Sequence, residues 1–575
     1  MKLRKLLALI TALVMSATFM AACNSSDSSS VADSGTGSSA DSDSSKQEEK
    51  ERNKVEAFSF AQDGTVTLSQ ERFLSVISDI TMSAPEGAKI YYTTDGSIPD
   101  ESAELYSEPI EFKAATSDFP NCLVLKAKAV YADGTQSDVV THTFFSMLGI
   151  NTRFQTLVFS VSGDPDALTN GPDGIMYGDN VELRGRESER EVYVEAINPD
   201  GTVVFEQGAG VRVYGAASRF ASIKSLKLFA RKEYDENHGK FNIDAFGTIG
   251  ADGSVMDKYD KLVLRNYGND FQFAFIRDEL NQRLAAQAGY TDVEAVVPAV
   301  VYLNGEYYGL VWLHESYCDD FFQDKYGKGA GYYEVIEGTE IEKKTDDDDP
   351  ENVAAATEFN EFYNSIAYTD LTDEENYKKL CEFMDVENYL QNYALNIYVN
   401  NFDWPQNNYK CYRYYAAEGE EYGENQMDGR WRFLFHDTDY SLDLYEQDLT
   451  NAGYNNIGKI FDENSDRYSP LFVNLMKRED CKQYFLDEMV RLMDGVLSYE
   501  NICETIDSMN SERYTEMFFY FDHLENLKRK DDSIWIWYDE YLRRTDNIKT
   551  FAKRRRGYVE RYLIESLELS EDYFG

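Results

Sequence analysis

The chain reads NFDWPQNN over residues 401–408 and WRFLFHDTD over residues 431–439, and these polar stretches carry the most structural information. Asp403 and Asn408 have the spacing D-x4-N. Apolar residues lead into Asp437, which predicts a buried strand that ends at a carboxylate. Because residues i and i+2 of a strand face the same way, we expect Asp437 and Asp439 to converge on one cation.

This order of acids and amides fits phosphoryl transfer. In such chemistry one carboxylate orients or deprotonates the attacking hydroxyl, an Asn and an Asp hold Mg²⁺, and a lysine held by an acid neutralises phosphate. Protein kinases place D-x4-N before a metal-binding Asp, the order of Asp403, Asn408 and Asp437. Lys224 and Glu315 are the candidate lysine and acid. The spacing alone is a weak signal, and an exposed Asp–Asn loop is the alternative.

The chain before these stretches is predicted to be β-rich, and the chain around and after them helix-rich. Alternating or continuous apolar runs predict strands over 157–161, 190–195, 210–215, 225–229, 261–266, 296–303 and 307–315. Helices are predicted over 275–288, much of 359–398 and nearly all of 481–569. We therefore expect one large α+β domain over 148–575.

Residues 55–147 have the pattern of a small β module. Short β-branched and aromatic runs alternate with turn signals such as Asp95-Gly96, which predicts an antiparallel, Ig-like β-sandwich. The string IYYTTDGSIP over 90–99 resembles the chitobiase/β-hexosaminidase C-terminal-type module, an accessory domain without catalysis. Either Tyr91 or Tyr92 is expected in the core. The other packs as well or stacks on a cell-surface glycan.

The N-terminus is typical of an exported lipoprotein. Residues 1–22 combine a basic start with an apolar run and end in small residues before Cys23, which resembles a bacterial lipobox. The alternative is an ordinary signal peptide cut nearby, which leaves a free cysteine. The Ser/Asp-rich segment 23–54 has too few apolar residues to fold, so it is predicted to be a tether. We expect an extracytoplasmic protein, lipid-anchored to the bacterial cell membrane.

Composition excludes several function classes. The 575 residues include 103 Asp and Glu against 56 Lys and Arg, a net charge of −47, which argues against binding nucleic acid. The 5 histidines form no HExxH or HxH site. A GxSxG nucleophile elbow and a GxxxxGK[ST] loop are absent as well.

Several sequence blocks, taken together, resemble the spore-coat CotH kinase-like family over roughly 150–560. They are GVRVYG (210–215), KSLKL (224–228), LRN (264–266), YLNGEYYGL (302–310) with Glu315, NFDW with NNY (401–409), and WRF with DTD (431–439). The resemblance implies an atypical protein kinase-like fold that uses ATP and a divalent metal, Mg²⁺ or Mn²⁺.

The resemblance also implies roles for individual residues. Asp403 is expected to accept the proton of the substrate hydroxyl. Metal ligands are expected at Asn408, Asp437 and Asp439, and ATP contacts at Lys224, Arg265, Asn266 and Glu315. The family often has a proline and an extra lysine before Lys224, which this chain lacks. The alternative for Lys224 is strand packing, with its stem buried and its ammonium in water.

These observations favour an exported, membrane-anchored kinase-like enzyme. It is expected to transfer the γ-phosphoryl group of ATP to Ser or Thr of a surface or secreted protein. The alternative is a catalytically silent surface scaffold, adhesion or glycan-associated protein on the same fold. Assignment as a glycoside hydrolase would rest only on the accessory module over 55–147. Resemblance to an accessory domain of chitobiase does not imply the activity of that enzyme.

Overall fold

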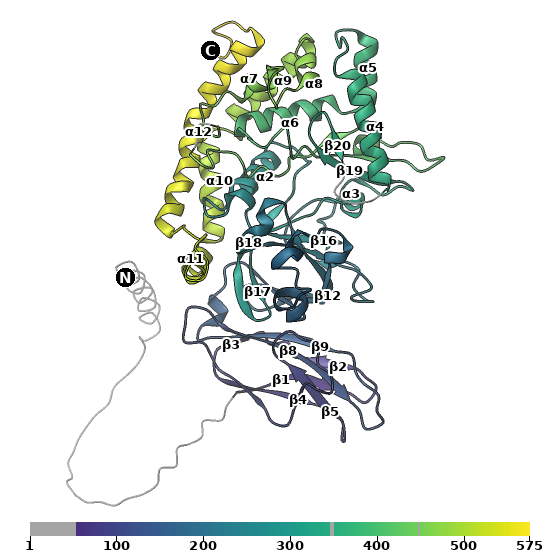
Figure 1. Ribbon diagram of the computed structural model, residues 1–575, viewed down its shortest axis with the longest axis vertical. Helices are drawn as coiled ribbons and strands as arrows, with labels where there is room; N and C mark the ends of the chain where they lie inside the picture. The colour runs from purple at the N-terminus through teal and green to yellow at the C-terminus, as the bar shows by residue number, and fades with distance from the viewer. Residues whose placement is uncertain (1–52, 345–349, 447–448) are drawn as a thin grey trace, which may run out of the picture. The chain divides into compact units, whose positions relative to one another are not determined.

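The computed structural model describes residues 53–344, 350–446 and 449–575 (Figure 1). The expected signal peptide (1–22), the lipidation site Cys23 and nearly all of the expected tether (23–54) lie outside these residues. No helix in the described part of the chain has the length and apolar character needed to cross a membrane.

The first strands form two sheets with a shared apolar core that includes Phe58, Leu125 and Phe144. One sheet has the order β2-β1-β4-β7, with β1 (Asn53–Phe60), β2 (Val66–Leu68), β4 (Ser78–Ser83) and β7 (Ile110–Phe112). The other has the order β3-β9-β8-β5-β6, with β3 (Phe73–Leu74), β5 (Lys89–Thr93), β6 (Glu104–Leu105), β8 (Asn121–Val130) and β9 (Val140–Ser146).

The sequence pattern predicts a purely antiparallel sandwich, but both sheets contain a parallel pair of strands. The pairs β1–β4 and β3–β9 run parallel, since long connections bring those strands together. Tyr91 is buried, and half-buried Tyr92 packs edge-on against Tyr106. Tyr91 is therefore the core residue of the pair, and Tyr92 the more accessible one.

A closed barrel follows, with the strand order β10-β11-β12-β13-β16-β18-β17. Its members are β10 (Leu157–Ser162), β11 (Arg190–Ile197), β12 (Val203–Tyr214), β13 (Ser225–Phe229), β16 (Lys261–Arg265), β17 (Val296–Leu303) and β18 (Glu306–His314). All pairs are antiparallel except β10–β17. Alternate side chains such as Val211, Leu226 and Leu264 share one apolar core, so their strand neighbours project from the opposite face.

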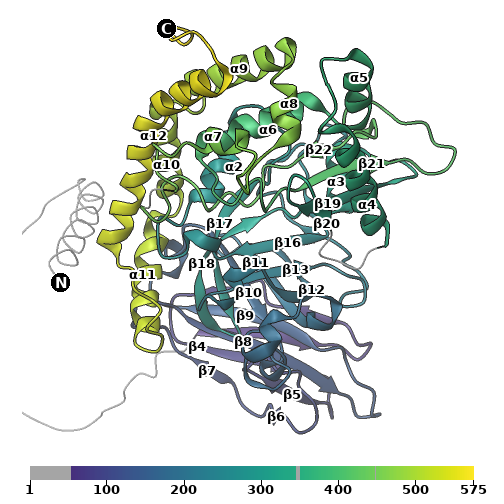
Figure 2. The same cartoon turned by 45° about the horizontal axis from the view of Figure 1, so that its top comes forward.

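The helices gather on one side of the barrel strands (Figure 2). They are α2 (Arg277–Gln287), α3 (Asp319–Tyr326), α4 (Pro350–Ile366), α5 (Glu374–Phe383), α6 (Val386–Val399), α7 (Asn456–Phe461), α8 (Pro470–Leu475), α9 (Glu479–Asp494), α10 (Tyr499–Glu512), α11 (Tyr514–Lys528) and α12 (Tyr538–Leu567). The apolar faces of these helices except α3 form the largest core of the described chain with the outer barrel residues Val300 and Trp312. Phe321 and Phe322 of α3 join the inner barrel core instead. The β-rich first half and helix-rich second half confirm the α+β prediction.

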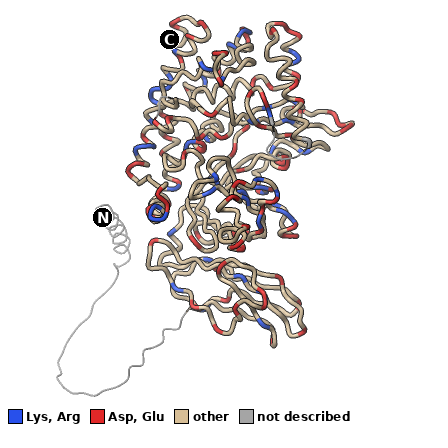
Figure 3. Tube along the Cα trace, viewed as in Figure 1, with Lys and Arg blue, Asp and Glu red and all other residues tan. Residues whose placement is uncertain are grey.

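Small sheets complete the fold. The order β20-β19-β21-β22 joins β19 (Tyr332–Gly338), β20 (Lys343–Lys344), β21 (Cys411–Tyr415) and β22 (Arg432–Phe433), and β14 (Phe241–Asn242) pairs with β15 (Lys258–Tyr259). Acidic and basic residues are interspersed along the described chain (Figure 3).

The predicted strand into Asp437 is wrong in its extent. β22 ends at Phe433, and Asp437 has a left-handed backbone with φ of 49°. Residues 437–439 therefore do not form a strand, and strand geometry does not direct the side chains of Asp437 and Asp439 to the same side. Asn400 and Asn408 are also left-handed, with φ of 53° and 52°, a conformation that asparagine and aspartate tolerate better than most residues.

Candidate active site

Arg265 is the centre of the site. It ends β16, and its guanidinium binds three carboxylates from two other segments. Nη1 donates to Asp278 at 2.9 Å, and Nη2 donates to Asp437 at 2.6 Å and to Asp439 at 2.9 Å. Burial opposes the charge, but these carboxylates hold the pKa of Arg265 well above its usual value. The arginine thus joins the start of α2 to the loop after β22.

Asp439 is buried and both of its oxygens are bound. Oδ2 accepts from Arg265 and from the backbone N–H of Asn269, and Oδ1 accepts from the Asn269 side chain. Gly268 is required here, since a Cβ at that position would overlap the Asp439 carboxylate. We expected Asp439 to bind a metal. The structure instead uses it to hold Arg265 and the 268–269 loop.

Asp437 remains reachable. Its side chain is 32% exposed, whereas that of Asp439 is 2% exposed. Its Oδ1 accepts from Arg265. Of the two aspartates expected to share a cation, only Asp437 presents an accessible carboxylate.

Asp403 and Asn408 lie together in the loop after α6. Oδ2 of Asp403 accepts hydrogen bonds from the side chains of Asn407 and Asn408, each at 3.2 Å. The backbone N–H of Asp403 donates to Asn401, which fixes the turn. Burial, together with the nearby charge of Asp437, raises the pKa of Asp403 above its ordinary value. The structure therefore brings Asp403, Asn408 and Asp437 into one site.

Lys224 and Glu315 have different partners, so the expected lysine–acid pair is wrong. The Lys224 ammonium donates to the backbone carbonyls of Arg219 (2.8 Å) and Ala221 (2.9 Å). Glu315 accepts from the Tyr259 hydroxyl at 3.1 Å and the Ala295 N–H at 2.9 Å.

The barrel register explains this separation. Extending the β13–β16 pairing places Lys224 level with Asn266, and extending the β16–β18 pairing places Glu315 level with Leu262. Four residues along β16 correspond to about 13 Å. Lys224 and Glu315 therefore lie at opposite ends of their strands.

Asn266 is also a structural residue rather than an exposed cofactor ligand. It is fully buried. Its Oδ1 accepts from Ser225 and its Nδ2 donates to the carbonyls of Ile223 and Ser218. These bonds tie the loop before β13 to the end of β16. That loop contains the Lys224 carbonyl partners, so Asn266 and Lys224 stabilise the same local structure.

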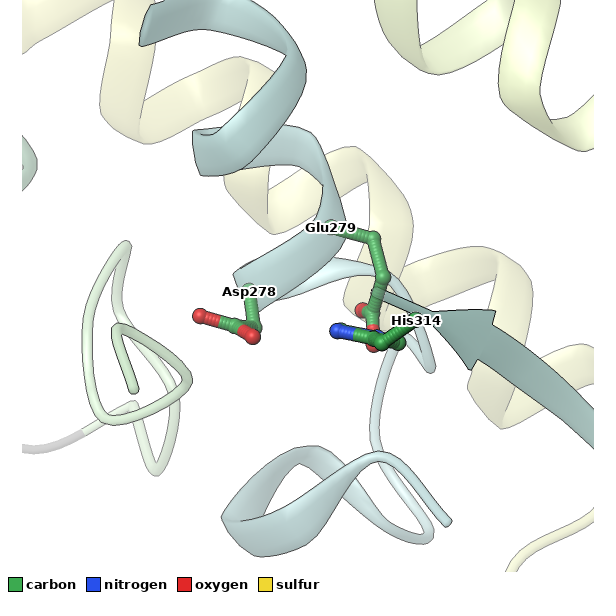
Figure 4. Close-up of side chains that lie close together, drawn as sticks. All are labelled: Asp278, Glu279 and His314. Carbon is green, nitrogen blue, oxygen red and sulfur yellow. The ribbon is translucent and has the colours of Figure 1, made fainter. Parts of the chain in front are cut away.

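Three buried groups, Asp278, Glu279 and His314, come close enough to resemble a metal site (Figure 4). Their hydrogen bonds give another explanation. His314 has Glu279 at 3.1 Å from Nε2 and Glu294 at 3.2 Å from Nδ1. Although burial opposes it, these carboxylates raise the pKa of His314 to about 9. Both ring nitrogens of His314 therefore face carboxylates of the protein, which accounts for this cluster as a buried ion-pair network.

Asp278 was missed as a site residue because sequence order alone does not say which acid faces Arg265. Its Oδ1 accepts from the N–H and hydroxyl of Thr438, and its Oδ2 accepts from Arg265. Burial opposes its charge, but Arg265 and His314 lower the pKa of Asp278 to about 2. The signal was its position in the first turn of α2, the next α-helix after the strand that ends at Arg265.

Two family models match parts of the chain. A family model described as "CotH kinase protein" matches residues 211–559, more than half of the chain, and one described as "Fn3 associated" matches residues 79–144. No curated protein matches the chain. A solved structure entitled "Crystal structure of the golgi casein kinase" is 10% identical, over 66% of this chain and 72% of that one. Its TM-score of 0.25 is too low to carry an argument.

Proposed function

The chain belongs to the CotH kinase protein family, and from this membership we propose that it transfers the γ-phosphoryl group of ATP to Ser or Thr of a surface or secreted protein. The observation that carries the proposal is the convergence of Asp403, Asn408 and Asp437 beside Arg265. Each of these groups has a separate task in phosphoryl transfer.

Asp403 is the proposed catalytic base. It is half-buried, and its carboxylate is oriented by two side-chain amides rather than neutralised by a salt bridge. Its raised pKa makes it a better proton acceptor than an ordinary surface aspartate. In this position it orients the acceptor hydroxyl and takes its proton as the new bond to phosphorus forms.

Arg265 and Asp278 form the proposed structural counterpart of the lysine–glutamate ion pair of protein kinases. In those enzymes a strand lysine pairs with a glutamate of the helix that follows, and the pair must form for activity. Here β16 supplies Arg265 and the first turn of α2 supplies Asp278. Since arginine stays charged and presents several donors in a fixed fork, it holds Asp278 and Asp437 together.

The residues fit a divalent cation at Asn408 and Asp437. Both present oxygen donors of the type that Mg²⁺ and Mn²⁺ prefer. The Asn408 amide nitrogen faces Asp403, which leaves its oxygen as the ligand atom. Asp439 does not fit, because both of its oxygens are already bound. A bound cation would supply charge neutralisation for the phosphate oxygens.

We further propose that the protein works outside the cell on a lipid anchor at Cys23. The support is the lipobox-like end of residues 1–22. A protein acceptor accords with the kinase family. The module over 55–147 serves as a spacer in this proposal, because Tyr91 is buried and the half-buried Tyr92 packs against Tyr106.

The test is phosphate transfer measured by intact-mass spectrometry. The full chain in detergent is incubated with ATP and Mg²⁺ or Mn²⁺, with and without an added acceptor protein, beside Asp403→Asn and Asp437→Ala. We expect added phosphate with the wild type and none with either variant. Failure with both metals, together with no ATP-dependent thermal shift, would point to a silent surface protein on the same fold.

A further inference from the structure

The site described above has a shortage of free positive charge. Phosphoryl transfer needs a cation that neutralises the phosphates of the donor. Arg265 is bound by three carboxylates, and the Lys224 ammonium is bound by two backbone carbonyls. Neither is free to meet an incoming anion without breaking those bonds.

Lys227 is a different case. It lies on β13 opposite Val263, two residues before Arg265 on β16, so its side chain leaves the same barrel face as that of Arg265. Among the described residues Lys227 forms no ion pair with a carboxylate. Its ammonium lies 5.2 Å from the ring centroid of Tyr214 and 5.9 Å from that of Phe229. An ammonium with aromatic rings and no counter-ion is a costly arrangement unless an anion joins it.

Lys410 and His436 approach the same place from the other side of the site. Glu337 comes directly after Ile336 of β19, and Lys410 directly before its partner Cys411 of β21, so Glu337 and Lys410 extend this antiparallel pairing by one step and form an ion pair of 2.7 Å. The Lys410 ammonium is 3.2 Å from Nε2 of His436, the residue before Asp437. Nδ1 of His436 is buried without a hydrogen-bond partner in the described part of the chain.

Tyr214 connects these groups. Its ring lies beside the Lys227 ammonium. The charges of Lys410 and Asp437 both act on the pKa of its hydroxyl. The charge of Lys410 also lowers the pKa of Lys227. The cations and the accessible carboxylate Asp437 therefore border one region, although Lys227, Lys410 and Asp437 come from three different segments.

We propose that Lys227, assisted by Lys410 and His436, is the phosphate-binding subsite for the phosphoryl donor, next to Asp437. This assignment rests on the proposed kinase function and replaces Lys224 in the role first expected for it. A lysine ammonium binds phosphate as a compact charge with several donors. Glu337 keeps Lys410 in position. Lys227 supplies a charge that forms no ion pair with a carboxylate in the described part of the chain, although Glu294 acts on it from a greater distance.

The subsite has a measurable consequence in proton uptake. Burial and the neighbouring Lys261 and Lys410 lower the pKa of Lys227 to about 8, against the opposing effects of Cys318 and Glu294. A bound phosphate stabilises the charged form, so Lys227 takes up a proton when the anion binds. Uptake near pH 8 would separate Lys227 from Arg265, which stays protonated throughout.

The experiment is isothermal titration calorimetry on the full chain in detergent at pH 8, in two buffers of different ionisation enthalpy. The probes are inorganic tripolyphosphate with Mg²⁺, ATP with Mg²⁺, and adenosine. Lys227→Met is expected to weaken the binding of tripolyphosphate and of ATP at least tenfold and to abolish proton uptake. The affinity for adenosine is expected to stay unchanged. Lys227→Arg is expected to restore affinity without proton uptake. The exposed Lys232→Met is the matched control.

The outcomes separate this inference from the proposed function. Wild-type affinity for tripolyphosphate in Lys227→Met, or a loss confined to adenosine, would overturn the phosphate subsite even if the enzyme transfers phosphate. Lys227-dependent binding without any transfer would support the subsite and refute the kinase function. If the wild type binds neither tripolyphosphate nor ATP, both proposals fail. If Lys227→Met does not fold, Lys227→Arg still tests the subsite, because tripolyphosphate binding to that variant is expected to occur without proton uptake. Proton uptake equal to that of the wild type would overturn the assignment.

Discussion

Asp437 and Asp439 are two residues apart but have different surroundings, which predicts different effects of the same substitution. Asp437→Asn removes one partner of Arg265 from a partly exposed site, so we expect a small loss of stability and a large rise in the metal concentration needed for activity. Asp439→Asn disrupts a fully buried ion pair, which costs about 3 kcal/mol. Urea unfolding and Mn²⁺ titration of both variants measure this contrast. Equal destabilisation would contradict the division of roles.

His314 predicts a pH dependence of stability. Although burial opposes the charge, the carboxylates of Glu279 and Glu294 raise the pKa of His314 to about 9. The folded state therefore binds a proton that the unfolded chain releases near pH 6.5, so the stabilisation is complete below that pH and is lost as the pH rises through about 9. A shift of this size is worth roughly 3 kcal/mol.

The measurement is urea unfolding of the wild type and His314→Gln at pH 6, 7.5 and 9. The wild type is expected to lose more stability than the variant over this range, because the glutamine carries no proton to release. Parallel pH dependence in the two proteins would show that His314 is not the responsible group.

For single residues, the sequence predicted the chemical role of a side chain better than it predicted which other residue that side chain contacts. The order of Asp403, Asn408 and Asp437, together with the family resemblance, predicted that they lie together. One loop carries the first two, and the hairpin of β21 and β22 leads to the third. The Lys224–Glu315 pair failed because both residues flank strands whose direction around the barrel has no local signal. Their positions became clear only from the register of three neighbouring strands.

Among the elements, the start of α2 depends on one buried aspartate. Asp270 accepts from the backbone N–H groups of Ala274, Ile276 and Arg277, and it forms an ion pair with the Arg277 guanidinium. The same helix turn carries Asp278, which holds Arg265. Asp270 therefore links the position of a helix to the geometry of the site.

Asp270→Ala is predicted to cost about 3–5 kcal/mol, because it leaves the buried Arg277 without its carboxylate. Transfer activity should fall as well, since α2 would no longer hold Asp278 against Arg265. The control is Asp373→Ala, which removes an exposed cap of α5 and should cost about 1 kcal/mol without affecting transfer. Chemical denaturation and the transfer assay measure both. Similar losses in the two variants would contradict the linking role of Asp270.

Most elements could be predicted, but their closure into a barrel could not. The runs at β13 and β17 have strong β propensity and clear turns, so their predicted bounds agree with the structure. The parallel pair β10–β17 closes the barrel across more than a hundred residues, and no local pattern encodes that contact. β22 was overextended because an apolar run can pack as irregular buried chain as well as a strand.

For the whole molecule, the first β module and the barrel share buried contacts. Glu195 of β11 is fully buried and accepts from the N–H and hydroxyl of Thr143 in β9, and Arg72 lies 3.5 Å away. Phe145, also in β9, packs against Tyr302 of the barrel with ring centroids 4.9 Å apart. Phe145 belongs to the same apolar core as the helices.

This sharing predicts that the module and the kinase-family region unfold as one unit. Phe145→Ala should cost about 3–5 kcal/mol and lower a single melting transition of the full chain, because its cavity opens in the common core. Calorimetry measures the number of transitions. The control is Leu125→Ala, whose side chain lies in the separate core of the module. If two transitions appear and Phe145→Ala shifts only one of them, the module is independent, and its contacts with Glu195 and Tyr302 do not support the barrel.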